Sequence, residues 1–203
     1  QRQMCIRDRT LVEAAHNSVG LDGGIGTKSE LYMLLEEHRL WTSQLEAVNK
    51  VLEEMILKVP HVEKLLAMKG VGSITIAGFI AEVGDIRRFQ SPKQIQKYAG
   101  LELVENSSGK QKGKTRISKR GRRKLRKILY QVMVPLLAGN QEFRTIYDYY
   151  VTRVKNPLKR RQAMIAVSCK LIRVFYAVLT KGVDYDRFKM MSDIHHESEH
   201  IIA

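Results

Sequence analysis

Two adjacent serines and a glycine, Ser107, Ser108 and Gly109, stand immediately before a long run of basic residues. A serine hydroxyl becomes an effective nucleophile where a base, a metal or strong positive charge favours the alkoxide. Nearby cations also stabilise the negative charge that develops at phosphorus when a phosphodiester is attacked, and glycine lets a backbone pass close to a phosphate. The same three residues are typical of a flexible turn in a lysine-rich loop, so residue types alone leave both interpretations open.

The basic run lies between residues 109 and 127 and contains eleven Lys or Arg residues and no acidic residue. A charge run is usually a solvated face, but eleven like charges repel one another unless an anion balances them. We therefore predict that this run binds phosphate groups. The residues expected to hold DNA or RNA phosphates are Lys110, Lys112, Lys114, Arg116, Lys119, Arg120, Arg122 and Arg123.

The charge of the whole chain supports a polyanionic partner. The 203 residues include 35 Lys or Arg and 21 Asp or Glu, which gives a formal net charge of +14. A positive charge of this size indicates the kind of binding partner rather than the fold, and nucleic acid is the first partner to consider. No apolar run approaches the roughly 20 residues of a membrane span, so we expect no membrane partner.

Cysteines and carboxylates are too scattered to predict a metal site. Cys5 and Cys169 lie far apart, which excludes a disulfide-rich secreted scaffold and favours a reducing cytoplasm. The basic half carries only a few separated acidic residues, not the clustered carboxylates that a two-metal nuclease requires. The sequence therefore predicts no metal ligand and no cofactor of its own. Those acidic residues are Glu102, Glu105, Glu142 and Asp148.

Two short helices joined by glycines precede the basic run. The pattern predicts helices over residues 61–68 and 73–83, connected by Gly70-Val71-Gly72, with Ser73 as the N-cap of the second. In a helix-hairpin-helix element, such glycines let the backbone approach a phosphate that the second helix's amides bind. We expect Gly70 and Gly72 to contact the DNA backbone, although a glycine hairpin is also ordinary packing between helices.

A long helix is predicted over residues 29–59, with Ser29 as its N-cap and Pro60 as its end. Apolar residues recur at spacings of three and four, which is a heptad pattern. We expect a coiled coil that pairs two helices or two protomers, and a single helix of a bundle is the alternative. The seam consists of Leu31, Leu34, His38, Trp41, Leu45, Val48, Leu52, Met55 and Val59.

The remaining pattern favours a mainly α fold. Helices are expected over residues 93–99, 122–138, 141–155 and 159–181, the first closed by Gly100, and residues 105–114 are expected to form a loop. Residues 101–104 are a short extended candidate, and no convincing alternating run exceeds five residues. The glycine-rich residues 20–26 are expected to be a loop or hinge.

The predicted organisation has five parts. Residues 1–9 lack periodicity, read more like translated adapter sequence than protein, and are set aside as an artefact. Residues 10–28 form a connector, residues 29–59 the coiled coil, residues 60–186 the main domain, and residues 187–203 a frayed tail.

Three stretches together resemble a known family. They are LLAMKGVGSITIAGFIAEVGDIRRFQSPKQIQKYAGL, SSGK, and RISKRGRRKLRKILY. Over residues 31–186 the chain resembles the C-terminal transposase domain of the insertion-sequence 110/116/902 group, which includes Piv-type invertases. The most specific part is Ala99-Gly100-Leu101, Ser108-Gly109, and residues 117–121 with Leu125-Arg126 in the following helix.

The resemblance implies a mechanism and partners. Family members carry an N-terminal RNase-H-like domain with four acidic residues that bind Mg²⁺, and a C-terminal serine that forms a covalent linkage to DNA. That serine maps to Ser108, with Ser107 as the alternative. The group is thought to use a structured non-coding RNA as a guide, and a composite site joins two protomers with help from the coiled coil.

The chain departs from the family in two places. Gly100-Leu101 continues into Glu102-Leu103, without the proline often found there. The acidic N-terminal domain is not in this sequence, so we expect a fragment that binds nucleic acid and self-associates but does not recombine DNA alone. A non-catalytic, dimeric helix-hairpin-helix module is the alternative function, and a basic scaffold for acidic partners is a weaker third.

Overall fold

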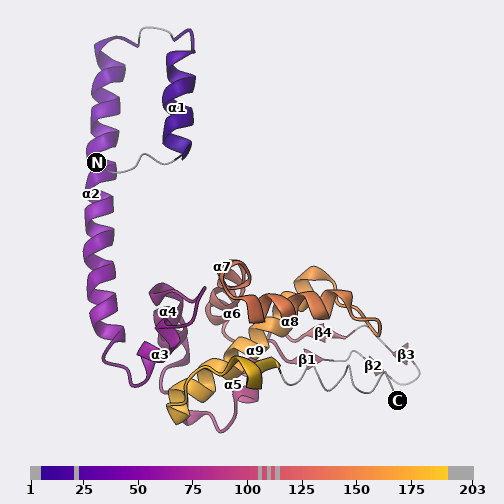
Figure 1. Ribbon diagram of the computed structural model, residues 1–203. Coiled ribbons are helices and arrows are strands. Elements are labelled where there is room, and N and C mark those ends of the chain that lie inside the picture. Colours follow the sequence, from indigo (N-terminus) through magenta and orange to yellow (C-terminus); the bar gives the residue numbers. More distant parts are fainter. Residues whose placement is uncertain (1–5, 21–22, 105–106, 109–110, 113–114, 192–203) are drawn as a thin grey trace. The chain divides into compact units, whose positions relative to one another are not determined.

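The computed structural model describes residues 6–20, 23–104, 107–108, 111–112 and 115–191 (Figure 1). Helices dominate these residues, which confirms the mainly α prediction. The chain divides into two compact units, residues 1–48 and 49–203. The helices are α1 (Ile6–His16), α2 (Gly24–Ile56), α3 (Val62–Leu66), α4 (Ser73–Val83), α5 (Pro92–Tyr98), α6 (Arg123–Gln131), α7 (Met133–Gly139), α8 (Gln141–Thr152) and α9 (Arg160–Lys181), with a 3₁₀ turn η1 (Ile86–Arg88).

The first unit contains α1 and most of α2. The helix α2 begins at Gly24, so the loop predicted over residues 20–26 was wrong for residues 24–26, and Ser29 lies inside the helix rather than at its N-cap. Glycine inside a helix costs about 1 kcal/mol relative to alanine but does not prevent helix formation. The helix α1 starts at Ile6 and therefore crosses the expected boundary between residues 9 and 10.

The apolar seam of α2 is exposed within the chain. Leu31 is 56% exposed, Trp41 62% and Leu45 62%. Only the C-terminal end of α2 belongs to the second unit, where Ile56 is buried and Leu52 packs at the edge of the core. The long helix is therefore present as predicted, whereas its pairing into a coiled coil stays a prediction.

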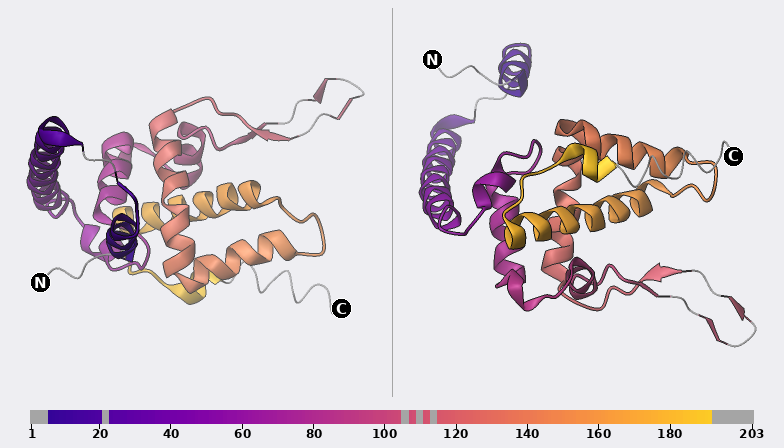
Figure 2. Two further views of the ribbon diagram at one scale, coloured as in Figure 1. Left: turned by 90° about the horizontal axis from the view of Figure 1, so that it is seen from above. Right: turned by 60° about the horizontal axis from the view of Figure 1, so that its bottom comes forward.

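The core of the second unit is built around α9. This helix contacts η1, α3, α5, α6, α7 and α8, while α4 packs against α6 (Figure 2). Phe175 of α9 and Phe79 of α4 meet edge to face, with 4.9 Å between ring centroids. Leu125 and Leu129 place one face of α6 in the same core, which leaves its basic face outside.

Two differences from the predicted elements have a local cause. The single helix expected over residues 122–138 is divided into α6 and α7 at Val132. Pro135 lacks the amide that would bond to Gln131, and its ring crowds that carbonyl, so the first helix ends there. The N-cap of α4 is Gly72 rather than Ser73, which is the first helical residue.

Among the described residues, α9 is long and apolar enough to cross a membrane by length and composition. The prediction that no apolar run approaches the length of a membrane span overlooked α9. Its apolar face is nevertheless part of the protein core, because Val167, Leu171 and Phe175 have no exposed surface. Burial of this face is what a core helix requires.

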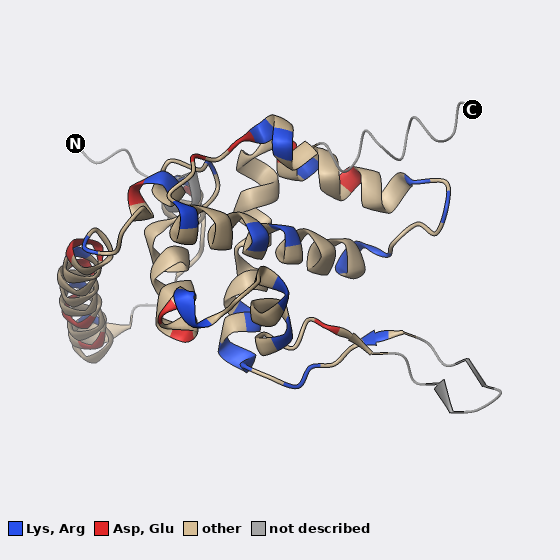
Figure 3. Cartoon of the chain, turned by 90° about the horizontal axis from the view of Figure 1, so that it is seen from below, with Lys and Arg blue, Asp and Glu red and all other residues tan. Residues whose placement is uncertain are grey.

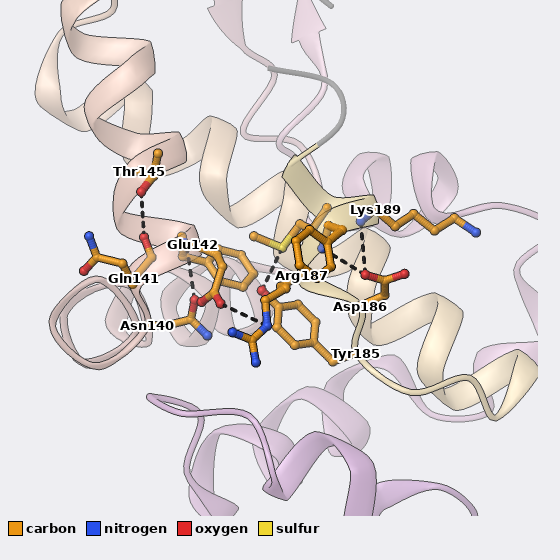
Figure 4. Close-up of polar contacts among 11 residues, drawn as sticks. Asn140, Gln141, Glu142, Thr145, Tyr185, Asp186, Arg187 and Lys189 are labelled. Carbon is orange, nitrogen blue, oxygen red and sulfur yellow. Dashed lines mark hydrogen bonds and ion pairs between the residues drawn. The ribbon is translucent and has the colours of Figure 1, made fainter. Parts of the chain in front are cut away.

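The segment after α9 folds back onto α8 rather than fraying directly (Figure 4). Tyr185 stacks on Phe143 at 6.3 Å between ring centroids, and its hydroxyl lies 3.2 Å from the sulfur of Met190. Arg187 and Glu142 form an ion pair at 3.8 Å. Residues 187–191 are helical and Met190 is buried, so the packed domain continues past the predicted boundary at residue 186.

Candidate nucleic-acid interface

A β-hairpin arm carries the two serines away from the helices (Figure 2). Its inner ladder pairs β1 (Leu103–Val104) with β4 (Arg116–Ile117), and its outer ladder pairs β2 (Ser107–Ser108) with β3 (Gln111–Lys112). Both ladders are antiparallel, with Ser107 opposite Lys112 and Ser108 opposite Gln111. Residues 105–114 were predicted to be loop throughout, and that prediction was wrong for the two paired strands.

The pairing could not be predicted from periodicity because it has no apolar alternation. Each strand has only two residues, which is too short to show a period, and Leu103 and Val104 of β1 are both exposed. Backbone hydrogen bonds hold such a ribbon, and its sequence is free to be polar. Side chains of residues 105–114 lie outside the described part of the structure, including those of Ser107, Ser108, Lys110, Lys112 and Lys114.

Backbone hydrogen bonds lock the two roots of the arm together. The amide of Ser118 donates to Glu102 O at 2.8 Å, Lys119 to Gly100 O at 3.0 Å, and Arg122 to Tyr98 O at 2.8 Å. The guanidinium of Arg126 adds a bond to Ala99 O at 2.8 Å. The two most specific sequence stretches, residues 99–101 and 117–121, are therefore the two halves of one clamp at the base of the arm.

Two glycines make this clamp possible. Gly100 has a φ of +71° and Gly121 a φ of +137°, which L side chains rarely adopt. A Cβ on Gly100 would lie 2.7 Å from Arg120 O, and one on Gly121 would collide with Tyr98 O. Close backbone approach between the two roots thus depends on glycine at both positions.

The described cations that were predicted to bind phosphate lie on the returning half of this clamp, along β4 and the turn that leads to α6 (Figure 3). All four of these cations are exposed, namely Arg116, Lys119, Arg120 and Arg123. Lys119 has a φ of +56°, so the backbone turns sharply where the arm returns to α6. These four side chains come from β4, from the turn after it and from the first residue of α6, and together they form a positive rim around the root of the arm.

Arg122 belongs both to this rim and to a cluster with Tyr98, Glu82 and Arg88 that was not predicted from the sequence. Its Nε donates to Tyr98 OH at 2.7 Å and lies 4.0 Å from Glu82 Oε2. Arg88 stacks over Phe89 and Tyr98, with 4.7 Å and 5.2 Å from its Cζ to the two ring centroids. Basic and aromatic residues interleaved in Arg87-Arg88-Phe89 were the available signal, because that pattern is typical of single-stranded nucleic-acid binding.

The cluster favours negative charge at its centre. The hydrogen bond from Arg122, reinforced by Arg88, lowers the pKa of the Tyr98 phenol below its usual value of 10.0. Glu82 Oε2 is buried without a hydrogen-bond partner among the described residues, so it holds Arg122 by charge at 4.0 Å rather than by a close hydrogen bond. Two arginines and a phenol are therefore gathered beside the arm, where an anion could bind.

The two glycines of the α3–α4 connection differ in their surroundings. Gly70 has a φ of +85°, and a Cβ there would lie 2.7 Å from Leu136 Cα of α7. Gly70 thus has a packing role, whereas Gly72 is exposed, with nothing within 4 Å of a Cβ. Contact of either glycine with a phosphate stays a prediction.

Within the part of the chain that the structure describes, no three His, Cys, Asp or Glu side chains gather in a way that could hold a metal ion. The Mg²⁺ implied by the family resemblance therefore has no ligand set among those residues.

Comparison with known proteins gives a consistent family. Residues 62–148 match the model of the transposase IS116/IS110/IS902 family. The chain is 28% identical over 155 residues to the pilin gene-inverting protein of Moraxella bovis, covering 73% of this chain and 47% of that protein. It is 25% identical over 158 residues to a protein of Pseudomonas aeruginosa named "Probable family 20 transposase", covering 75% and 45% of the two chains.

A third relative extends the set to another insertion element. The transposase for insertion sequence element IS1111A of Coxiella burnetii is 28% identical over 148 residues, covering 71% of this chain and 38% of that protein. The chain thus spans less than half the length of each of these three relatives. The matched residues 62–148 include α3 to α6, the arm and the clamp at its base. These matches confirm the predicted resemblance to the IS116/IS110/IS902 transposase family.

Proposed function

We propose that this chain is the nucleic-acid-binding and strand-joining part of a DNA transposase or recombinase. The observation that carries the proposal is the clamped arm, which has a rim of exposed cations at its root and two serines in its outer ladder. The names of the relatives, which include a transposase and a gene-inverting protein, support DNA as the substrate.

The proposed nucleophile is Ser108, with Ser107 as the alternative. In the reaction, the serine Oγ forms a bond to a DNA phosphorus while the bond from that phosphorus to one flanking sugar oxygen breaks. The serine proton leaves, and the released sugar oxygen takes up a proton, so the phosphodiester is conserved as a serine–DNA ester. Cations around the phosphate stabilise the developing charge, and a preformed base for the arm reduces the ordering cost of bringing serine and phosphate together.

Three further parts of the proposal follow the family resemblance. A structured RNA would bind the same positive rim, because phosphate contacts carry no sequence information by themselves. The exposed seam of α2 would pair protomers, as an apolar heptad stripe left in water favours association. Mg²⁺ would be held by carboxylates from a further domain, so this chain alone would bind DNA without rejoining strands.

Salt-dependent binding tests the interface. A labelled DNA duplex is titrated with the whole chain at several salt concentrations, and the variant Arg116→Gln/Lys119→Gln/Arg120→Gln is compared with wild type. The slope of log affinity against log salt should fall by about 0.9 for each phosphate that the variant no longer neutralises. Equal slopes for the two proteins, with equal affinity, would contradict a phosphate-binding role for the rim.

A covalent adduct tests the nucleophile. The chain is joined to the N-terminal half of a transposase relative, and its adduct with labelled DNA is followed on a denaturing gel. We expect Ser108→Ala to abolish the adduct and Ser107→Ala to retain it, while both variants still bind DNA. The reverse pattern assigns the role to Ser107, and adducts in both variants would exclude the two serines.

The non-catalytic alternative remains a binding module dimerised through α2. It predicts the same salt dependence but no adduct with either serine present. The gel therefore distinguishes the two functions, because binding is common to both and only one forms a covalent bond.

A further inference from the structure

A second basic surface lies at the turn between α8 and α9, away from the residues that sequence reasoning assigned. From residue 149 to residue 183 the chain has eight Lys or Arg residues and no acidic residue. Five of the eight fall within residues 153–161, in the turn itself and the first two residues of α9. The eight are Arg153, Lys155, Lys159, Arg160, Arg161, Lys170, Arg173 and Lys181.

Hydrogen bonds and a cation–π contact support the backbone of this turn. The amide of Leu158 donates to Tyr150 O at 2.8 Å, which closes the turn. Arg153 Nε donates to Asn156 O at 2.9 Å, and its Cζ lies 5.6 Å from the Tyr150 ring centroid. The Arg153 side chain is therefore used to stabilise the turn, and the backbone of the turn positions the other four cations.

Those four cations, Lys155, Lys159, Arg160 and Arg161, are all exposed. Among the described residues of this unit, ion pairs join Lys64 to Asp184, Arg87 to Asp85, Lys97 to Glu102, Arg122 to Glu82, Arg144 to Asp148 and Arg187 to Glu142. By contrast, within the described part of the chain none of the four turn cations takes part in such an ion pair. Among the described residues, no carboxylate therefore balances the charge of these four cations, whereas cations elsewhere in the unit are paired.

The helix that follows adds to the positive potential. The first turn of α9 contains no acidic residue, although acidic side chains are favoured at that end of a helix. Arg160 and Arg161 instead place like charge beside the positive end of a 22-residue helix dipole. This arrangement is unfavourable in the free protein and becomes favourable when a polyanion lies against it.

The turn and the arm extend toward the same end of this unit. Figure 2 shows the hairpin and the α8–α9 connection projecting in one direction, and Figure 3 shows Lys and Arg along that connection and at the start of α9. A nucleic acid held at the root of the arm could therefore continue onto the turn. Arginine guanidinium groups suit this ligand because they bind phosphate oxygens in a bidentate manner.

We propose that Lys155, Lys159, Arg160 and Arg161 form a second phosphodiester-binding surface, which engages the backbone of the same nucleic acid that the arm binds. The inference rests on the proposed function for the presence of that nucleic acid. It adds to that function four residues outside the arm that bind the nucleic-acid backbone. They contact phosphates and do not recognise bases.

The test compares three variants of the whole chain. The turn variant carries Lys155→Gln, Lys159→Gln, Arg160→Gln and Arg161→Gln. The arm variant is Arg116→Gln/Lys119→Gln/Arg120→Gln. A matched control changes the four exposed cations Lys28, Arg39, Lys50 and Lys58 of α2 and its C-terminal end to Gln, so it loses the same charge as the turn variant. Circular dichroism and thermal melting confirm that each variant is folded.

Binding is measured by fluorescence anisotropy with a random-sequence DNA duplex and, separately, with a folded RNA hairpin. For at least one probe we expect the turn variant to bind about tenfold or more weakly than the control. On duplex DNA its salt slope should be lower by about 0.9 for each phosphate that is no longer neutralised. The probe whose affinity falls further identifies the backbone that the turn holds.

An excess of polyglutamate is added as a competitor of similar charge density, and we expect it to displace the nucleic acid only weakly.

The outcomes separate this inference from the proposed function. Equal affinity and slope for turn variant and control, with a weakened arm variant, would overturn the second surface alone. Absence of binding by wild type to both probes at low salt would overturn both proposals. Displacement by polyglutamate as effective as by unlabelled DNA would show a surface for acidic chains in general, and would also overturn a site for phosphodiesters.

Discussion

Two clusters in the second unit use the same three residue types, Tyr, Arg and Glu, in opposite ways. At the root of the arm, Tyr98 accepts a hydrogen bond from Arg122, and Arg122 lies 4.0 Å from Glu82. Between α8 and the segment that follows α9, Tyr185 stacks on Phe143 while Arg187 pairs with Glu142 at 3.8 Å (Figure 4). The first cluster opens onto a positive rim, whereas the second closes the C-terminal segment onto the core.

The pKa values of the two tyrosines express this difference. Hydrogen bonding to Arg122 lowers the pKa of Tyr98, whereas burial, followed by the charge of Glu142, raises the pKa of Tyr185 to about 12. Residue types alone do not predict these directions, because they depend on the arginines that hydrogen-bond to Tyr98 and on the burial of Tyr185. The comparison identifies the arm root as the cluster suited to anions.

The largest effect is expected from breaking the clamp under the arm. Gly121→Ala should lower the free energy of unfolding by roughly 2 to 3 kcal/mol, because the backbone there has a φ of +137° and a Cβ would collide with Tyr98 O. Urea denaturation measures the loss. Gly72→Ala is the control, since nothing lies within 4 Å of its Cβ, and it should cost less than about 1 kcal/mol. Equal losses in both variants would show that the clamp is not a stabilising feature.

A matched pair of arginine variants tests the functional side of the comparison. Arg122→Gln should weaken binding to a DNA duplex several-fold and reduce its salt slope by about 0.9. Arg187→Gln should leave binding unchanged and lower stability by less than about 1 kcal/mol, because its pair with Glu142 is partly exposed. Anisotropy titrations and urea melts provide both readouts. Equal binding by the two variants would remove the distinction between the clusters.

At neutral pH the smallest effect is expected from the tyrosines, which differ mainly in alkaline solution. Phenolate absorbance of Tyr98→Phe and Tyr185→Phe, subtracted from wild type, should show Tyr98 ionising below pH 10.0 and Tyr185 near pH 12. Because the folded pKa of Tyr185 is raised, the folded state holds its proton longer than the unfolded chain. Stability should therefore fall as pH rises between about 10 and 12, and Tyr185→Phe should lessen that fall. An identical fall in wild type and variant would show that another group causes it.

Much of the helical framework was predictable because apolar spacing reports which face of a helix is buried. The bounds of α4 and the start of α8 agree with the expectation, and α9 differs by one residue at its start. The divided helix at Val132 was missed although Pro135 gave the signal, since the apolar spacing continues across the break. The hairpin was missed because two-residue strands are too short to leave a periodic pattern.

The candidate site was predictable in part. The basic run, the serines and the two motif halves are all readable as local sequence, since charge and glycine content need no tertiary information. Arg87-Arg88-Phe89 was a local signal, whereas the grouping of Arg88 with Tyr98 and Glu82 was not predictable, because these residues come from three separate elements. The turn between α8 and α9 was also overlooked, since its cations are interrupted by apolar residues and dispersed over two helix ends.

By itself the sequence determined the mainly α class, the long amphipathic helix, the concentration of positive charge and the family motifs. These are properties of residue type and spacing, which the chain carries whatever its conformation. Only the tertiary structure decided that residues 98–102 and 118–122 clamp one another, that Arg126 points inward while Arg116 and Arg120 stay in water, and that one tyrosine is acidified and another is not. These features depend on which backbone groups and side chains come into contact in the fold, and spacing along the sequence does not reveal those contacts.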